Sequence, residues 1–282
     1  MPRPRRQSRP PTPIDPTPPP RPTTPAPDLR RLLLNHLNNL KIAPVGQTLD
    51  ALLTQAEQEG WSHLEFAHRL LGGLANERHE RSIERRIYEA GFGETCLLEQ
   101  FDWNFERTIH RPQIEELATG DFVRRKCNLV MVGHSGVGKS FLLKALGRCV
   151  CVHGLRVRYF TSAVLLTKLA ASLADQTLPQ KIRELAGYDL LVIDEFGFDR
   201  IERQEHPESA NLLYKILDAR NQKKSTALAT NVDFDAWGDY LGDAPLAMAF
   251  LDRLVDRAII LKIKGKSYRA SRSIKNPSPS QD

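Results

Sequence analysis

The segment GHSGVGKS at residues 133–140 limits the folds open to this chain more than any other stretch. It follows the apolar run 129–132 and precedes an apolar helical pattern that begins at Phe141. A glycine-rich turn between a strand and a helix points consecutive backbone N–H groups, and the positive end of the helix, at phosphate oxygens. The spacing in this context therefore predicts a phosphate-binding loop. A glycine-rich turn that holds no ligand is the alternative.

The residue types in this loop each have a chemical reason to be there. Lys139 brings a mobile positive charge to the β- and γ-phosphates, and the Ser140 hydroxyl is a ligand for Mg²⁺. The glycines let the backbone approach the phosphates closely. We expect the whole loop to bind the nucleotide, that is Gly133, His134, Ser135, Gly136, Val137, Gly138, Lys139 and Ser140.

Two carboxylates, Asp194 and Glu195, follow a second apolar run at 190–193. If this strand neighbours the strand before the loop, Asp194 can hold Mg²⁺ and Glu195 can orient and polarise the attacking water. Alone, two acids at a strand end usually form a solvated turn. Together with the loop they predict hydrolysis of ATP, with ATP and Mg²⁺ as cofactors.

Two other residues are candidates for the same site. Asn231 follows a third apolar run and either contacts the γ-phosphate and the attacking water or caps the next helix. Arg253 lies near the end of a helical pattern, where it is a candidate arginine finger for the γ-phosphate of a neighbouring subunit. Pairing of Arg253 with Asp252 or Asp256 at the surface is the alternative.

Short apolar runs alternate with helical patterns from about residue 128 to the last apolar run. The runs are 128–132, 156–160, 189–193, 225–229 and 258–263, and the helical patterns are 139–152, 162–173, 178–186, 207–222 and 245–256. Strands that alternate with helices at this spacing are typical of a three-layer α/β domain on a mainly parallel sheet.

The first part of the chain has a different composition. Residues 1–28 contain twelve of the 19 prolines and five arginines, which predicts a disordered extension. From Asp28 onward, leucines at helical spacing predict three helices, with Thr48 and Ser62 as caps of the second and third.

A fourth helix is expected over about 76–90, and Arg78, Arg81 and Arg85 recur along one face of it. Composition alone leaves two interpretations open. The face is either a basic binding stripe or a solvated face held by Glu77–Arg81 and Arg81–Glu84 pairs.

Charge and cysteine usage narrow the class of protein. The net charge of +6 comes from the two ends, because residues 1–28 carry +3 and residues 262–282 carry +5. No apolar stretch approaches the roughly 18 residues of a membrane span, and the N-terminus lacks the apolar run of a signal peptide. Metal-ligand spacing is absent among the cysteines, so we expect buried thiols at Cys96, Cys127, Cys149 and Cys151.

The segments GHSGVGKS, LLVIDEFG, LATN, AFLDRLVDRA and KGKSYRASR occur in an order that resembles the IstB-like ATP-binding proteins. These are helper ATPases of insertion-sequence transposition, and they are related to the DnaC helicase loaders within the AAA+ class. Upstream, the ERHERSIERRIYEAGF segment and the FDWNF connector extend the resemblance, which covers roughly residues 30–272.

The resemblance implies a domain plan. It consists of a disordered extension at 1–28, a helical DNA-binding domain with its connector at 29–108, an AAA+ ATPase domain with a parallel five-stranded sheet at 109–272, and a flexible tail at 273–282. A small all-α domain thus precedes the ATPase domain, and no C-terminal lid is expected.

The resemblance also implies site roles. Asp194 and Glu195 take the Mg²⁺ and water roles, Asn231 is the first sensor, Arg253 is the finger, and Arg269 contacts nucleotide in the manner of a second sensor. The implied DNA contacts are sequence-independent and come from Arg78, Arg81, Arg85, Arg86, Lys168, Lys181 and Arg183.

The function implied is an ATPase that assembles on duplex DNA with ATP and regulates transposition through target selection and transposase recruitment. Its partners would be double-stranded DNA, the transposase of the same element, and further copies of this chain with ATP at their interfaces. We expect a bacterial cytoplasmic, DNA-associated protein without a membrane contact. A DnaC-like helicase loader is the nearest alternative. A small-molecule P-loop kinase and a DNA scaffold that hydrolyses ATP very slowly are more distant ones.

Overall fold

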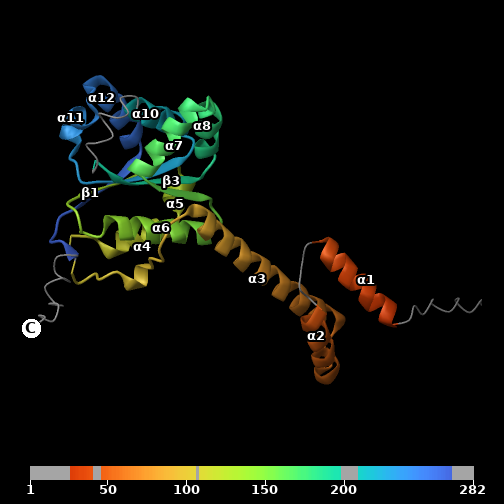
Figure 1. The fold of residues 1–282 in the computed structure, drawn as a ribbon. Coiled ribbons are helices and arrows are strands. Elements are labelled where there is room, and N and C mark those ends of the chain that lie inside the picture. Colours follow the sequence, from red (N-terminus) through yellow and green to blue (C-terminus); the bar gives the residue numbers. More distant parts are fainter. Residues whose placement is uncertain (1–25, 41–45, 106–107, 198–208, 269–282) are drawn as a thin grey trace, which may run out of the picture. The chain divides into compact units, whose positions relative to one another are not determined.

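A computed structural model describes residues 26–40, 46–105, 108–197 and 209–268 of the protein (Figure 1). The chain divides into two compact units, Met1–Arg78 and His79–Asp282. Most of the proline-rich extension, all of the expected tail at 273–282, and Arg269 lie outside the described residues.

The first unit is helical. It contains α1 (Ala26–Asn39), α2 (Gly46–Glu59) and the first half of α3 (His63–Ala90). Its core consists of four buried leucines, which are Leu37, Leu49, Leu70 and Leu74. The leucines at helical spacing thus form the predicted apolar face.

The structure tests the predicted helix caps and helix boundaries of this unit. The Ser62 hydroxyl accepts a hydrogen bond from the Glu65 backbone N–H at 3.2 Å, so the predicted cap is confirmed. Thr48 instead lies inside the first turn of α2, and its prediction as a cap is wrong. The predicted third and fourth helices are one continuous helix, α3. No proline lies between residues 63 and 90, and the glycines Gly72 and Gly73 weaken a helix without ending it.

The second unit contains the parallel sheet. Its strands are β1 (Asn128–Gly133), β2 (Val157–Thr161), β3 (Leu190–Phe196), β4 (Ser225–Thr230) and β5 (Ala258–Ile263), in the order β2-β3-β4-β1-β5. Every pairing is parallel. These strands confirm the strand prediction. Their apolar runs are typical of parallel strands that are covered on both faces.

Helices cover both faces of this sheet, as Figure 1 shows. On one face lie α4 (Arg111–Ala118) and α6 (Lys139–Val152), and on the other lie α7 (Ser162–Ala174), α8 (Leu178–Ala186), α10 (Ser209–Arg220), α11 (Trp237–Leu241) and α12 (Ala244–Val255). The expected three-layer α/β architecture is therefore confirmed. Several short elements were not expected, namely α4, α5 (Asp121–Arg124), α11, and the 3-10 turns Leu98–Gln100 and Phe234–Ala236.

The division between the units falls earlier than the expected domain boundary after residue 108. Ala90 and Phe92, which follow the basic part of α3, are buried in the same core as Leu143 and Val150 of α6. The second half of α3 and the connector after it therefore belong to the α/β unit. No helix among the described residues combines the length and apolar character needed to cross a membrane.

Candidate functional site

The phosphate loop lies between β1 and α6, where the sequence predicts it. Gly136 and Gly138 have φ angles of 82° and 93°, in the left-handed region that favours glycine. A Cβ on Gly138 would lie 2.8 Å from the ring of Phe101. Both the backbone conformation and the space around it therefore require glycine at this position.

Lys139 is the first residue of α6, and its side chain is buried within the loop. Its ammonium donates hydrogen bonds to the carbonyl oxygens of Gly133 at 2.6 Å and His134 at 2.7 Å. Burial lowers the pKa of Lys139, while the nearby Asp194 carboxylate raises it. The loop thus holds a positive charge where phosphate oxygens would replace the carbonyl partners.

Asp194 is only 1% exposed and accepts hydrogen bonds on both carboxylate oxygens. Oδ1 accepts from the Ser140 hydroxyl at 3.1 Å and from the Glu195 backbone N–H at 2.8 Å. Oδ2 accepts from the Tyr159 hydroxyl at 2.7 Å. The structure therefore brings together the two residues that the sequence predicts as Mg²⁺ ligands.

The route by which these residues meet differs from the one expected. The strand of Asp194, β3, is not the neighbour of β1, because β4 lies between them. On the face covered by α6, the residues of β4 that pair with β1 are Ala227 and Ala229, whose side chains are small. Ser140, in the first turn of α6, lies over this strand and reaches Asp194.

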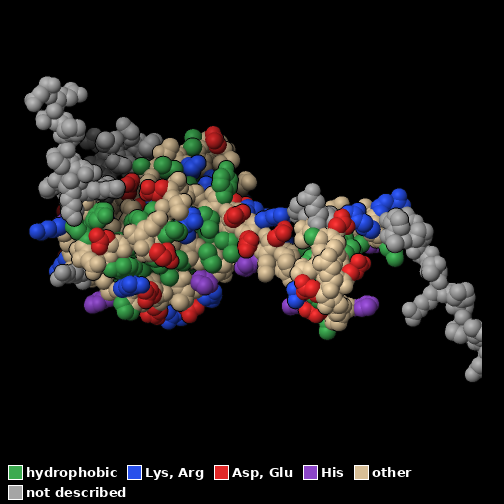
Figure 2. Space-filling model, turned by 90° about the horizontal axis from the view of Figure 1, so that it is seen from below, with side chains coloured by type: hydrophobic (Ala, Val, Ile, Leu, Met, Phe, Trp, Pro, Cys, Tyr) green, Lys and Arg blue, Asp and Glu red, His purple; other side chains and the backbone are tan. Residues whose placement is uncertain are grey.

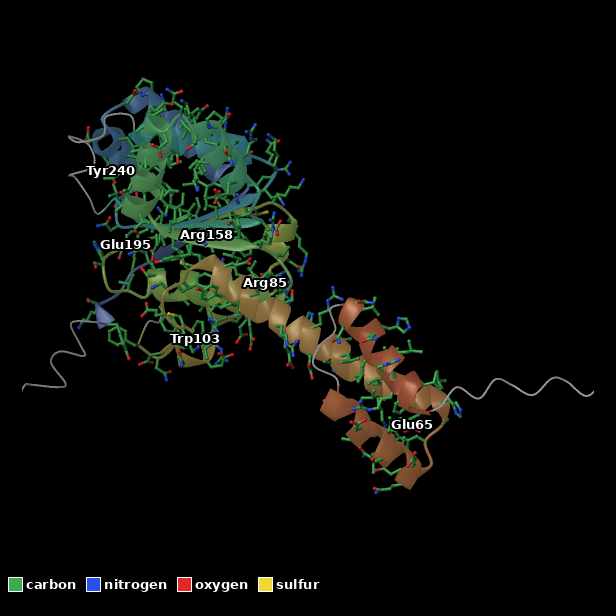
Figure 3. The ribbon with its side chains drawn as sticks, turned by 45° about the vertical axis from the view of Figure 1, so that its right-hand side comes forward. Glu65, Arg85, Trp103, Arg158, Glu195 and Tyr240 are labelled. Carbon is green, nitrogen blue, oxygen red and sulfur yellow. The ribbon has the colours of Figure 1, made fainter. Side chains whose placement is uncertain are left out.

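Glu195 lies at the end of the sheet, where Figure 3 labels it, and its side chain is exposed. Its φ is 58°, which is uncommon for a residue other than glycine. The pairing of β3 with β4 shifts register between Ile193 and Phe196. Asp194 and Glu195 are adjacent but differ in exposure, because the Asp194 side chain is buried and the Glu195 side chain is exposed.

A cavity of about 390 Å³ extends from the loop, and both Asp194 and Glu195 line it. The connector after α3 also lines this cavity, through Phe101, Asp102 and Phe105, and so does Tyr268 after β5. The rings of Phe105 and Tyr268 lie 5.0 Å apart, edge to face. The Tyr268 backbone N–H also donates to the Gly136 carbonyl at 3.0 Å.

These wall residues were not among the predicted site residues, and neither was Tyr159. The connector carries a sequence signal, because aromatic residues alternate in Phe101-Asp102-Trp103-Asn104-Phe105 outside any helix or strand pattern. Trp103 packs on Phe101 with the ring centroids 4.8 Å apart (Figure 3). Burial, and next the Asp194 carboxylate, raise the pKa of Tyr159.

Asn231 lies directly beyond β4, whose last residue Thr230 pairs with Val132 and Phe196. It is exposed at the same end of the sheet as Glu195. Its amide oxygen is 3.0 Å from the place that a Cβ on Gly197 would take. The alternative role as a cap of the next helix is wrong, since Asp233 takes the cap position before Phe234.

Arg253 forms two ion pairs on the surface of the α/β unit. Its guanidinium lies 3.1 Å from Asp218 of α10 and 2.7 Å from Asp252. Surface pairing with Asp252, one of the two alternatives, is thus observed within a single chain. Asp256 instead accepts a hydrogen bond from Gln222 at 3.0 Å.

The expected DNA-contacting residues fall into two groups. Arg78, Arg81 and Arg85 on α3 are exposed, and so are Lys168 and Arg183, while Lys181 pairs with Glu184 at 2.6 Å. Arg86 is different, because its guanidinium donates to the Cys151 carbonyl at 3.0 Å and to Ser82 at 2.7 Å. The structure gives Arg86 a role in attaching α3 to α6, which removes it from the proposed stripe.

Charged side chains of both signs alternate on the face of the α/β unit that Figure 2 presents. The Arg85 guanidinium lies 3.8 Å from the Glu89 carboxylate.

The four cysteines are free thiols, with Cys96 and Cys151 buried. Burial raises the pKa of Cys151 to about 12. No group of three or more potential metal-ligating His, Cys, Asp or Glu side chains occurs within the described ranges.

Comparisons with known proteins identify relatives that are described as ATP-binding proteins. The model of the family described as IstB-like ATP binding protein matches residues 35–276. A relative from Pseudomonas aeruginosa, described as an ATP-binding protein of insertion sequence IS21, is 35% identical over 83% of this chain and 86% of its own length. A second, from insertion sequence IS5376 of Geobacillus stearothermophilus, is 28% identical over 86% of this chain and 94% of its own length.

Solved structures with a similar fold include DnaI, with a TM-score of 0.49 and 21% identity over 60% of this chain and 90% of that one. The DnaC helicase loader matches with a TM-score of 0.44 and 22% identity, over 57% of this chain and 98% of that one. The expected α/β fold with a parallel five-stranded sheet is confirmed by the order and direction of the strands in this chain itself. With its family model matched from residue 35 to residue 276, the chain belongs to the IstB-like ATP-binding protein family.

Proposed function

We propose that this protein is an Mg²⁺-dependent ATPase that assembles on duplex DNA and regulates DNA transposition by selecting targets and recruiting a transposase. The observation that carries the proposal is the meeting of Lys139, Ser140, Asp194 and Glu195 at one cavity. The relatives' descriptions as ATP-binding proteins of insertion sequences support the biological role.

The site residues divide the hydrolysis reaction among them. The loop N–H groups and Lys139 bind the phosphate oxygens. Ser140 and Asp194 offer the oxygen ligands that Mg²⁺ prefers, and they lie 3.1 Å apart. Bound there, Mg²⁺ supplies charge neutralisation for the transferred phosphoryl group. Glu195 accepts a proton from water as the water oxygen bonds to the γ-phosphorus and the bond to the bridging oxygen breaks.

The aromatic wall suits the base of the nucleotide. Phe101 contacts the loop at Gly138, and Phe105 and Tyr268 lie beside each other on the same cavity. Aromatic rings stack favourably on a purine. We place the adenine against this wall, with the triphosphate extending toward Lys139.

DNA binding is assigned to α3. Arg78, Arg81 and Arg85 recur along the helix and are exposed, so they can approach backbone phosphates without reading bases. Lys168 on α7, with Lys181 and Arg183 on α8, adds a second set of positively charged side chains. Within an assembly, Arg253 would exchange Asp218 and Asp252 for the γ-phosphate of a neighbouring copy, and Asn231 would contact the same phosphate from within its own subunit.

The chemistry is tested by ATP turnover in three variants. Lys139→Ala should lose nucleotide binding, and Glu195→Gln should retain binding while turnover falls at least about hundredfold. Lys215→Ala, which removes an exposed lysine of α10, is the matched control and should behave as wild type. Unchanged turnover in Glu195→Gln would refute the water-activating role, and phosphate transfer to added metabolites would favour a kinase.

The DNA role is tested by sedimentation with a random-sequence duplex and a matched single strand. ATP-dependent multimers on the duplex, absent in Lys139→Ala, are the expected result. Arg81→Gln should lower the slope of log affinity against log salt by about 0.9, and Lys215→Gln should leave it unchanged. Preference for the single strand would favour a helicase loader, and a monomer indifferent to DNA would contradict both roles.

A further inference from the structure

Tyr159 on β2 lies beside the proposed metal ligand and takes no part in the mechanism above. β2 is an edge strand of the sheet, and its pairing with β3 places Tyr159 opposite Val192 and Thr161 opposite Asp194. Residues two apart on a strand point to the same face, so Tyr159 and Asp194 share the face covered by α6. They are diagonal neighbours, and an aromatic side chain is long enough to span that distance.

Thr161 is the residue directly opposite Asp194, yet its hydroxyl is engaged elsewhere. It caps α7 by accepting a hydrogen bond from the Val164 backbone N–H at 3.4 Å. Asp194 Oδ2 therefore accepts its hydrogen bond from the Tyr159 hydroxyl, at 2.7 Å. A phenylalanine at position 159 would fill the same space without supplying this donor.

The ring of Tyr159 is held on several sides. Phe92 lies with its ring centroid 6.0 Å away, and the ammonium of Lys144 lies 5.3 Å from the Tyr159 ring centroid. Lys144 is in turn paired with Glu94 at 2.6 Å, and Glu94 lines the cavity. The orientation of the hydroxyl thus depends on residues from the connector and from α6.

The preceding residue on β2, Arg158, connects this arrangement to α3. Arg158, which Figure 3 labels, donates a hydrogen bond to the Glu89 carbonyl in the last turn of that helix. Its guanidinium also lies 5.0 Å from the ring of Phe160. The end of α3 is thereby fixed to the strand that carries Tyr159.

We propose that Tyr159 is a positioning residue for Asp194. Its hydroxyl holds Oδ2 so that Oδ1 faces Ser140, the arrangement in which both side chains can bind one Mg²⁺ ion. This inference rests on the proposed function, in which Asp194 is a metal ligand. Hydrogen bonds from outside a metal site commonly orient its carboxylates in this way.

The test is the Mg²⁺ dependence of nucleotide binding, measured with a fluorescent ATP analogue in Tyr159→Phe. Loss of the hydroxyl should raise the Mg²⁺ concentration that gives half of the maximal increase in analogue binding by about tenfold or more. Binding of the analogue in EDTA should not change. Tyr188→Phe, which removes a hydroxyl from the same unit outside the cavity, should match wild type in both conditions.

Three results would overturn the inference, and the last is distinguishable from the first two. In the first, Mg²⁺ changes analogue binding equally in wild type and in Tyr159→Phe. In the second, Tyr159→Phe binds the analogue more weakly by the same factor with and without Mg²⁺. Either result would make Tyr159 only a packing residue. If wild-type binding does not respond to Mg²⁺ at all, the proposed role of Asp194 fails first.

Discussion

The helical unit and the α/β unit differ in how much they bury. Four leucines form the described core of the helical unit, whereas twenty buried residues lie on each face of the sheet. A buried leucine contributes about 1.5–3 kcal/mol, which is small beside the chain entropy lost by ordering whole helices. The helical unit is therefore expected to be marginally stable, while the α/β unit is a rigid platform for chemistry.

The two units also differ in what they bury. The fully buried core residues described in the helical unit are leucines, and further leucines of this unit stay exposed, among them Leu29, Leu40 and Leu64. The α/β unit buries Asn128, Asp194 and Arg220, each with hydrogen-bond partners. Removing one member of a buried polar network costs more than removing a methyl group. The most damaging substitutions should thus lie in the α/β unit.

Arg220→Met should have the largest effect on stability. Arg220 ends α10, is 1% exposed, and donates to the carbonyl oxygens of Leu185 at 2.6 Å and Tyr188 at 2.9 Å and to the Thr226 hydroxyl at 3.1 Å. Methionine keeps the side-chain volume but leaves these acceptors without their donor, at a cost of about 4 kcal/mol or more. Calorimetry should show a large fall in the unfolding temperature of the α/β unit. Lys215→Met on the same helix is the control, and an equal shift there would contradict the prediction.

Leu49→Ala should come second and should act on the other unit. Leu49 is fully buried in the four-leucine core, so its truncation should cost about 2–4 kcal/mol. That is enough to unfold a marginal unit, which protease sensitivity of residues before Arg78 would reveal. ATP binding should persist. Leu64→Ala, at an 81% exposed position, should change neither property, and loss of ATP binding in Leu49→Ala would show that the two units do not fold independently.

The α/β fold followed from the sequence because its strands are continuous apolar runs between helical patterns. Those signals are local, and the predicted ranges agree with β1 to β5 within a few residues. The predicted break between the third helix, which ends near Leu74, and the fourth, which begins near Asn76, was wrong because no helix-ending residue lies there and the chain continues as α3. The short helices α4 and α11 have too few residues for their periodicity to be recognised.

The site could be predicted only where a motif carries it. Lys139 and Ser140 follow from the spacing of the phosphate loop, and Asp194 follows from its place directly after an apolar run. Tyr159 and Tyr268 could not be found in this way, because strand pairing and the fold of the segment after β5 bring them to the cavity. Arg86 was grouped with its neighbours by charge, whereas its hydrogen bond to Cys151 depends on how α3 meets α6.

Asn128→Ala tests a smaller polar tie in the α/β unit. The Asn128 amide donates to the Leu254 carbonyl at 2.9 Å, and its amide oxygen accepts from the Thr226 backbone N–H at 2.8 Å. Loss of both should cost about 1–3 kcal/mol, measured by denaturant unfolding. Asn128→Asp keeps the acceptor but places a carboxylate against a carbonyl oxygen, so it should be at least as destabilising at neutral pH. An Asp variant as stable as wild type would contradict this account.

Arg253→Ala should have the smallest effect on stability, because both of its ion pairs are exposed to solvent. We expect an unfolding temperature indistinguishable from wild type, and the same for Asp218→Asn. Turnover separates the two variants if Arg253 reaches a neighbouring subunit: it should fall in Arg253→Ala and persist in Asp218→Asn. Mixing Arg253→Ala with Glu195→Gln should then restore part of the turnover, since an interface can combine an intact Glu195 from one subunit with an intact Arg253 from the other. Failure of the mixture to recover, in a sample shown to contain mixed assemblies, would restrict Arg253 to its pairs with Asp218 and Asp252.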